Sequence, residues 1–267
     1  MNTDQHRSNP NQKWIPVLSV FIGVHLWLIL PLLAQDKKKD AGPKLTVALP
    51  LVVEAGKKTK LVVRGSNLDG VTEVRVHEPK SKATLVGKPK KVGVPKDYPL
   101  DRVGDSEVEI ELDVSKDAPG RTIAFSVVGP GGESNRAQVA IADDTPRVAE
   151  KEENNGFDKA QTIRVPAAVE GKIDREKDVD VFQFTGKAGD KLRIEVQAAR
   201  LGSPADLMLT LLDSDKQILD SCDDFAGSPD PVLTVTLPRD GTYYLSLLES
   251  NDFGGSMFAY RLVVRKP

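Results

Sequence analysis

Apolar and polar residues alternate in short runs along most of the chain after residue 44, and the runs are bounded by Gly, Pro, Asp or Asn. The stretch EVEIELD (107–113) shows the pattern most clearly, because acidic and apolar residues take turns along it. An extended strand points successive side chains to opposite faces, so this alternation predicts strands with one buried face. Sustained helical periodicity is hard to find after residue 44. The pattern therefore predicts an all-β fold.

Seven short strands are predicted in the first half of the chain, with turn residues between them. They cover residues 45–53, 59–65, 72–77, 82–87, 107–113, 121–129 and 136–142. Seven strands of this kind predict an immunoglobulin-like β-sandwich over residues 45–145. The stretch KPKKVGVPKDYPLDRVGDS (88–106) is too rich in proline and lysine for a strand, and it is predicted to be an exposed connection.

A second set of eight strands follows the polar stretch DDTPRVAEKEENNGFDKA, which has the composition of a domain boundary. These strands are predicted at residues 168–173, 180–186, 191–198, 206–213, 216–221, 231–238, 241–249 and 257–265. They predict a jelly-roll-like β-sandwich over residues 146–267. The aromatic residues of these strands are expected mainly in the core, and those that face outward would offer a binding surface for a polymer.

The N-terminus has the pattern of an export signal. A polar, basic segment is followed by the apolar run WIPVLSVFIGVHLWLILPLLA, which ends at Ala34. This predicts a signal peptide over residues 1–34, followed by a charged spacer over residues 35–44. The apolar run is also long enough to cross a bilayer as an uncleaved anchor. In either case the folded part is expected outside the cytoplasm, in the periplasm, at the cell surface or secreted.

Composition narrows the classes of partner and cofactor. The formal net charge of −2 shows no basic excess, so a nucleic acid is not expected as a partner. Contact with a membrane is expected only through an uncleaved N-terminal segment. Cys222 is the only cysteine, which excludes an intramolecular disulfide, a thiolate zinc site and an iron–sulfur cluster.

The first half carries the segment EAGKKTKLVVRGSNLDGVTEVRV and later PGRTIAFSVVGPGGESN. These segments resemble the IPT/TIG family of immunoglobulin-like domains, whose members have a Gly-x-Asn-Leu-like turn after the second strand. The corresponding turn here is Gly65-Ser66-Asn67-Leu68. In exported bacterial proteins the resemblance implies a spacer or interaction module.

The second half shows several landmarks in order, namely EENNGFDKAQ, VEGKI, DVDVFQF, AGDKLRIEV, DLMLTLLD, DGTYYLSL and YRLVV. Together they resemble the bacterial pre-peptidase C-terminal domain. The resemblance implies a β-sandwich of the type attached to secreted peptidases, and some relatives in bacterial collagenases bind collagen and calcium. The chain departs from the family pattern Glu-Pro-Asn-Asn by having Glu153 where proline is common.

The stretch EKEENNG (150–156) has the residues that a calcium ion prefers, because a hard cation takes carboxylate, amide and carbonyl oxygens. Alternate residues of an extended segment point to one side, and Asn155-Gly156 can turn the backbone so that more oxygens converge. The resemblance to the collagenase-type relatives implies that aspartates of a nearby loop also contribute, and here the stretch IDREKDVDVF, with Asp174, Asp178 and Asp180, would supply them. The predicted ligands are Glu150, Glu152, Asn154, Asn155, Asp178 and Asp180. The alternative is an Asx turn with solvated carboxylates.

Candidate catalytic residues are few. His77 is the only histidine after the N-terminal segment, and no Gly-x-Ser-x-Gly or His-Glu-x-x-His motif accompanies it. The sequence therefore predicts a protein that is not an enzyme and has no cofactor other than calcium, although a hydrolase with an unrecognised site stays an alternative.

The predicted function is binding or scaffolding in the cell envelope, with an extracellular or envelope protein or a polysaccharide as the partner. An accessory or targeting role toward a secreted peptidase, exerted in trans, is a further alternative.

Overall fold

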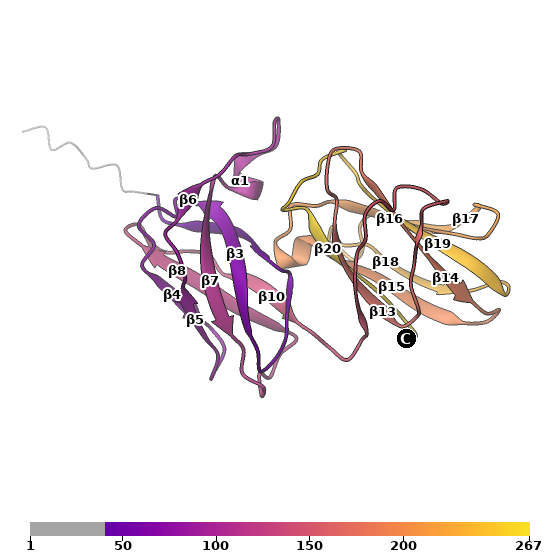
Figure 1. The fold of residues 1–267 in the computed structure, drawn as a ribbon, viewed down its shortest axis with the longest axis horizontal. Helices are drawn as coiled ribbons and strands as arrows, with labels where there is room; N and C mark the ends of the chain where they lie inside the picture. The colour runs from indigo at the N-terminus through magenta and orange to yellow at the C-terminus, as the bar shows by residue number, and fades with distance from the viewer. Residues whose placement is uncertain (1–40) are drawn as a thin grey trace, which may run out of the picture. The chain divides into compact units, whose positions relative to one another are not determined.

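The computed structural model describes residues 41–267, and these residues are almost all in strands and the turns between them (Figure 1). The N-terminal signal or anchor and most of the spacer fall outside the described residues. The first half contains one short helix, α1 (Leu100–Val103). Its strands are β1 (Lys44–Leu49), β2 (Val52–Val53), β3 (Lys58–Ser66), β4 (Glu73–Val76), β5 (Lys82–Leu85), β6 (Lys90–Lys91), β7 (Ser106–Asp113), β8 (Thr122–Gly129), β9 (Gly132–Glu133) and β10 (Ala137–Ile141).

The first-half strands form two sheets that enclose an apolar core. One sheet has the order β1-β3-β7-β5 with β6 also on β7, and the other has the order β2-β10-β8-β4 with β9 on β8. Strand β7 alternates between buried and half-buried residues along its length, as EVEIELD predicts. Ile110 of β7 and Phe125 of β8 are both fully buried in the common core. The predicted sandwich of the first half is confirmed.

One predicted strand of the first half is in fact two. Residues 45–53 were expected to form a single strand, but β1 ends at Leu49 and β2 begins at Val52 in the other sheet. Pro50 lies between them. A proline has no N–H to donate to a ladder and it restricts the residue before it, so the chain leaves the first sheet at this point.

The second half forms another pair of five-stranded sheets. Its strands are β11 (Arg147–Ala149), β12 (Gln161–Thr162), β13 (Ala167–Lys172), β14 (Val179–Gly186), β15 (Lys191–Gln197), β16 (Leu207–Leu212), β17 (Ile218–Cys222), β18 (Val232–Thr236), β19 (Gly241–Glu249) and β20 (Ala259–Arg265), with one short 3-10 helix, η1 (Ala199–Leu201). The sheet orders are β11-β13-β20-β15-β18 and β12-β14-β19-β16-β17. Phe182, Tyr243 and Tyr260 are buried between these sheets, so the prediction of a second sandwich with an aromatic core is confirmed.

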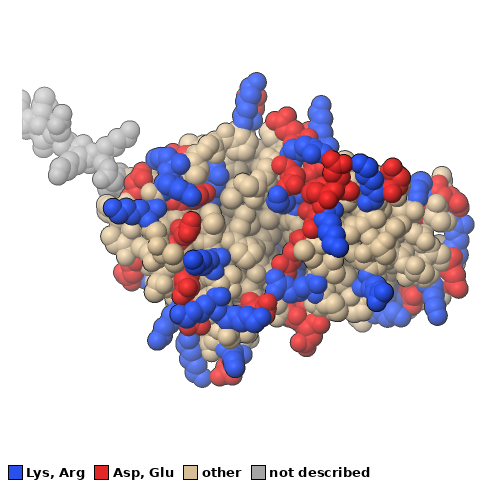
Figure 2. All heavy atoms as spheres, in the orientation of Figure 1, with Lys and Arg blue, Asp and Glu red and all other residues tan. Residues whose placement is uncertain are grey.

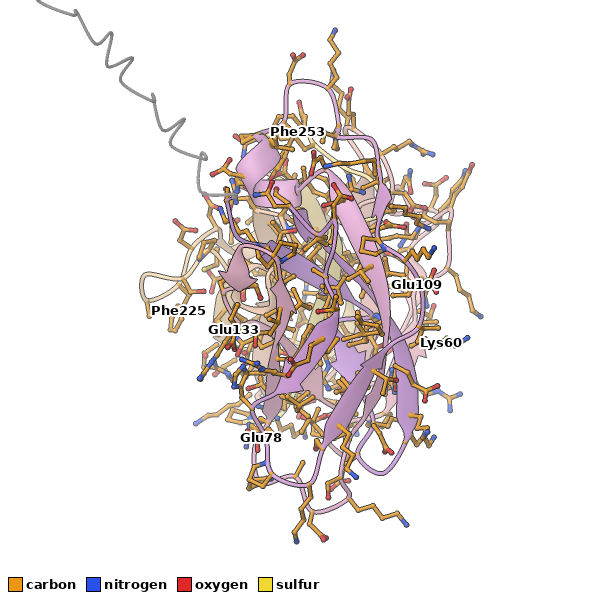
Figure 3. The ribbon with its side chains drawn as sticks, turned by 90° about the vertical axis from the view of Figure 1, so that its left-hand side faces the viewer. Lys60, Glu78, Glu109, Glu133, Phe225 and Phe253 are labelled. Carbon is orange, nitrogen blue, oxygen red and sulfur yellow. The ribbon has the colours of Figure 1, made fainter. Side chains whose placement is uncertain are left out.

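The connection over residues 88–106 differs from its prediction. Tyr98 and Val103 are 7% and 0% exposed, and they belong to the same apolar cluster as Phe258 of the second half. The Tyr98 ring lies 5.3 Å from the ring of Phe258 and 4.6 Å from that of Phe253, measured between centroids; Figure 3 labels Phe253 close to helix α1. The Tyr98 hydroxyl donates a hydrogen bond of 2.8 Å to the carbonyl of Pro204. The connection is exposed along much of its length, but its aromatic residue anchors it in the second core.

The described residues, 41–267, belong to one compact unit. Acidic and basic side chains are interspersed over much of the face drawn in Figure 2, with one dense group of acidic side chains. Among the described residues, no helix has the length and apolar character needed to cross a membrane.

Candidate metal centre

The turn that follows β11 brings the predicted acidic ligands to one edge of the second sandwich. Glu150 comes directly after β11, and its backbone N–H bonds to the carbonyl of Glu170 on β13 at 3.0 Å. The chain then turns back toward β14, where the N–H of Val181 bonds to the carbonyl of Asn154 at 3.1 Å. These two backbone bonds place the turn beside Asp180.

Four of the predicted ligands meet there, and we call Glu150, Glu152, Asn154 and Asp180 the acidic cluster. Carboxylate oxygens of the three acidic residues all lie within 4.8 Å of one another. The side-chain amide of Asn154 donates to Glu150 Oε1 at 3.2 Å. Asn154 and Asp180 are fully buried, whereas Glu152 is exposed. The cluster is therefore closed on one side by protein and open at Glu152.

Tyr260 of β20 joins two carboxyl groups of the cluster. Its hydroxyl oxygen lies 2.5 Å from Glu150 Oε1 and 2.7 Å from Asp180 Oδ2. A phenol has one proton to donate, so two such short contacts require a second proton in the group. A protonated Asp180 that donates to Tyr260, which in turn donates to Glu150, meets this requirement.

The pKa values agree with that arrangement. The pKa of Asp180 is raised to about 9, mainly by burial and secondly by the negative charge of Glu150. Burial also raises the pKa of Glu152, and the charges of Asp178 and Glu150 add to the effect. Three carboxyl groups this close repel one another, and in the absence of a cation the repulsion is relieved by a proton.

Two oxygens of the acidic cluster have no partner within the described part of the chain. Asn154 Oδ1 and Asp180 Oδ1 are both buried and accept no hydrogen bond. A buried acceptor without a partner is costly, and in native proteins it generally has a water or an ion to satisfy it. Carboxylate and amide oxygens are the donors that a hard cation takes. The residues of the cluster therefore fit calcium.

Gly171 allows the cluster to close. A Cβ atom at this position of β13 would lie 2.6 Å from Glu150 Oε2 and 2.7 Å from Cζ of Tyr260. Real Cβ atoms do not approach other atoms so closely, so a side chain here would displace Glu150 or Tyr260. The backbone N–H of the next residue, Lys172, donates to Glu150 Oε2 at 2.9 Å.

The other predicted ligands lie next to the cluster and have partners of their own. The side-chain amide of Asn155 donates to Asp178 Oδ1 at 3.0 Å, and the N–H of Asp174 donates to Asp178 Oδ2 at 2.7 Å. Asp178 thus holds the loop between β13 and β14 in place. Glu153, at the position where the family has proline, forms an ion pair with Lys159 at 2.8 Å.

Sequence reasoning did not find the roles of Tyr260 and Gly171. Tyr260 was one of the aromatic residues that were expected mainly in the core because they are spaced within strands. The one available signal was that both residues stand in the landmarks VEGKI and YRLVV of the resemblance. A second group of acidic residues, Asp206, Asp223 and Asp224, also lies close together, but two of the three are exposed and none has a buried oxygen without a partner.

His77 takes part in a different polar group. Its Nε2 lies 2.9 Å from Ser126 Oγ, and the Ser126 hydroxyl donates to Glu133 Oε1 at 2.6 Å; Glu133 is labelled in Figure 3. In a catalytic triad the histidine stands between the serine and the acid. Here the serine stands between the histidine and the acid, and it is fully buried.

Part of the second half of the chain is similar to a known family of domains. Residues 178–248 match the family model of the bacterial pre-peptidase C-terminal domain. A probable subtilase-type serine protease of Deinococcus radiodurans is 42% identical over 78 residues, which are 29% of this chain and 11% of that protein. The chain therefore spans only a small part of this relative.

Two of the solved structures that are similar to this chain share little sequence identity with it. The pre-peptidase C-terminal domain of a Bacillus anthracis collagenase is 15% identical with a TM-score of 0.33, over 46% of this chain and 100% of that one. A secreted serine protease of Vibrio cholerae is 7% identical with a TM-score of 0.29, over 86% of this chain and 51% of that one. The resemblance of the first half to IPT/TIG domains stays a prediction, whereas residues 178–248 are confirmed as similar to the bacterial pre-peptidase C-terminal domain.

Proposed function

We propose that the protein is an exported, non-catalytic binding or scaffolding protein of the cell envelope, and that calcium holds the edge of its second sandwich. The observation that carries the calcium role is the pair of buried, unpartnered oxygens of Asn154 and Asp180 beside two further carboxylates. The match of residues 178–248 to a domain family named for its place beside peptidases supports an accessory role. The apolar N-terminal segment supports export, to the periplasm, the cell surface or the medium.

The residues that would hold the ion are the carboxylates of Glu150, Glu152 and Asp180 and the amide oxygen of Asn154. A bound calcium ion supplies positive charge where three carboxyl groups now share a small space. Tyr260 orients the carboxyl groups of Glu150 and Asp180 from inside the core. Asp178 keeps the neighbouring loop closed, with both of its oxygens already occupied.

The polar groups of the described residues support a role without catalysis. The one Ser–His–Glu group has its serine buried and its members in an order that does not activate the hydroxyl. The acidic cluster is tied to the backbone and to Tyr260, which suits a structural ion more than an exchangeable one. The proposed task is therefore to bind a polysaccharide or an envelope protein.

The test is retention of the full chain on insoluble matrices, namely peptidoglycan, cellulose, chitin and fibrillar collagen. We expect retention on at least one of these matrices in calcium and release when a chelator is added, because the ion stabilises the fold that presents the surface. The variant Glu152→Gln should be retained less, and Glu153→Gln should behave like the wild type. Absence of retention on all four matrices would count against the binding role. Retention that is unchanged when the chelator is added would contradict only the role of calcium.

The partial match to a subtilase-type protease favours a second candidate, an accessory subunit that acts in trans on a secreted peptidase. Native purification from the producing cells separates this candidate from the first. A peptidase that remains bound through purification supports the accessory role, and purification of the chain without one opposes it.

A further inference from the structure

A second site of different chemistry lies away from the acidic cluster, in a cleft lined by residues of β20, the start of β8 and the end of β10. The side chains of Arg261 and Arg265 project from the outer face of β20, since the alternate residues Tyr260, Leu262 and Val264 fill the core. They line a cleft of about 220 Å³ together with Arg121, before β8, and Arg200 of η1. We call these four residues the arginine cleft.

Positive charge exceeds negative charge in this cleft. Four arginines line it, and the carboxylates that line it are those of Asp143 and Glu195. Each side-chain nitrogen of Arg200 already has a partner, namely Asp230, Glu195 and the carbonyl of Val196, at 2.5–2.9 Å. The surplus therefore lies at the other end of the cleft.

At that end, three arginines share one lining carboxylate. Arg261 donates to Asp143 Oδ1 at 2.8 Å, and Arg265 reaches Asp143 Oδ2 only at 3.7 Å. Arg121 also lines this end, and among the described residues only its backbone carbonyl takes part in a hydrogen bond, with the N–H of Ile141. Asp144 follows Asp143 and lines the adjoining hollow, where it offsets only part of the surplus.

The buried donor of Arg261 is the observation that points to a ligand. Arg261 is 3% exposed, and its Nε–H donates to no partner among the described residues. Its other nitrogens are used, one by Asp143 and one by Gln197 Oε1 at 3.2 Å. A guanidinium presents its donors as a fixed fork that fits the oxygens of a phosphate or sulfate group, and a buried unpaired donor is costly.

We propose that the arginine cleft binds a tetrahedral oxyanion, that is, a phosphate or sulfate group. Arg121 and Arg265 reach the group from the open side, and Arg261 contacts it from below. The group is either a free ion or an ester on a polymer, and the two sources share the same chemistry. This site is independent of the acidic cluster and extends the binding role to an anionic ligand.

The experiment is calorimetric titration of the full chain with sodium phosphate and sodium sulfate, against sodium chloride at equal ionic strength. We expect saturable binding of one ion per chain, weakened about tenfold by Arg121→Ala and about tenfold by Arg265→Ala, since each removes a charged hydrogen bond. Both residues are at least partly exposed, so the variants should fold. Arg75→Ala removes an exposed arginine from β4 and should leave binding unchanged.

Dextran sulfate and unsulfated dextran distinguish the two sources of the group. Binding of the sulfated polymer alone, lost in the same two variants, identifies a polymer ester as a ligand, and failure of the polymer to bind limits the site to free ions. No saturable binding of either ion, or equal binding by the wild type, Arg121→Ala and Arg265→Ala, would overturn the proposal.

Discussion

Replacing Tyr98 by alanine is expected to lower the free energy of unfolding by about 3–5 kcal/mol, the range found when a buried aromatic side chain is removed. The ring is 7% exposed and belongs to the core of the second sandwich, although it comes from the connection between β6 and β7. Its removal leaves a cavity against Phe253 and Phe258. The hydroxyl partner, the carbonyl of Pro204, also loses its donor. Urea denaturation of the full chain measures the loss.

Two variants separate the contribution of the ring from other effects. Tyr98→Phe keeps the ring and removes the hydrogen bond to Pro204, so it should cost about 1 kcal/mol. Phe225→Ala removes an aromatic side chain that is 46% exposed, and it should change stability by about 0.5 kcal/mol or less; Figure 3 labels Phe225 on a loop that extends outward. A Tyr98→Ala protein as stable as Phe225→Ala would show that the connection is not anchored.

The affinity of the acidic cluster for calcium is expected to rise about 100-fold from pH 6 to pH 8, because the ion must displace a proton. The pKa of Asp180 is raised to about 9 by burial and by the charge of Glu150, so the carboxyl group keeps its proton over this whole range. Each pH unit then changes the apparent affinity about tenfold. Calorimetric titration with calcium in buffers of different ionisation enthalpy measures both the affinity and the release of about one proton.

The stability of the calcium-free protein should fall as the pH rises, whereas its affinity for calcium should increase. The folded-state pKa of Asp180 lies above its ordinary value of 3.8. The contribution of this group is therefore complete below the unfolded pKa and is lost as the pH rises toward about 9. Asp180→Asn has no proton to displace, so its weaker calcium affinity should not depend on pH through this range. A flat affinity in the wild type, without proton release, would contradict the proton on Asp180.

Much of the fold could be predicted because the strands obey local rules. The alternation of EVEIELD appears as the burial pattern of β7, and Phe182, Phe184 and Tyr243 of β14 and β19 lie in the core as expected. One failure occurs where a distant contact decides the outcome. Tyr98 stands among prolines and lysines that indicate an exposed loop, and only the apolar cluster of the second half explains why its ring is buried. Pro50 carried a local signal for a break, which the apolar run around it obscured.

The acidic cluster could be predicted in part for the same reason. Glu150, Glu152 and Asn154 are close in sequence, and alternation alone indicates that their side chains converge. Asp180 was added to the predicted ligands because of the resemblance to the pre-peptidase C-terminal family. Tyr260 contacts the cluster because β13 pairs with β20 and places Gly171 opposite it, and no local pattern shows that pairing. The sequence pattern indicated a core position for the Tyr260 ring but not the contacts of its hydroxyl.

The proposed role of calcium is tested most directly by scanning calorimetry of the full chain in calcium and in chelator. Saturation at about 100 times the dissociation constant stabilises a protein by about 2.7 kcal/mol, which should raise the melting temperature by about 5–10 °C. Glu152→Gln should lose most of this rise, and Glu153→Gln, whose carboxylate pairs with Lys159, should keep it. A melting temperature that is the same in calcium and in chelator for the wild type would contradict a calcium ion at the acidic cluster.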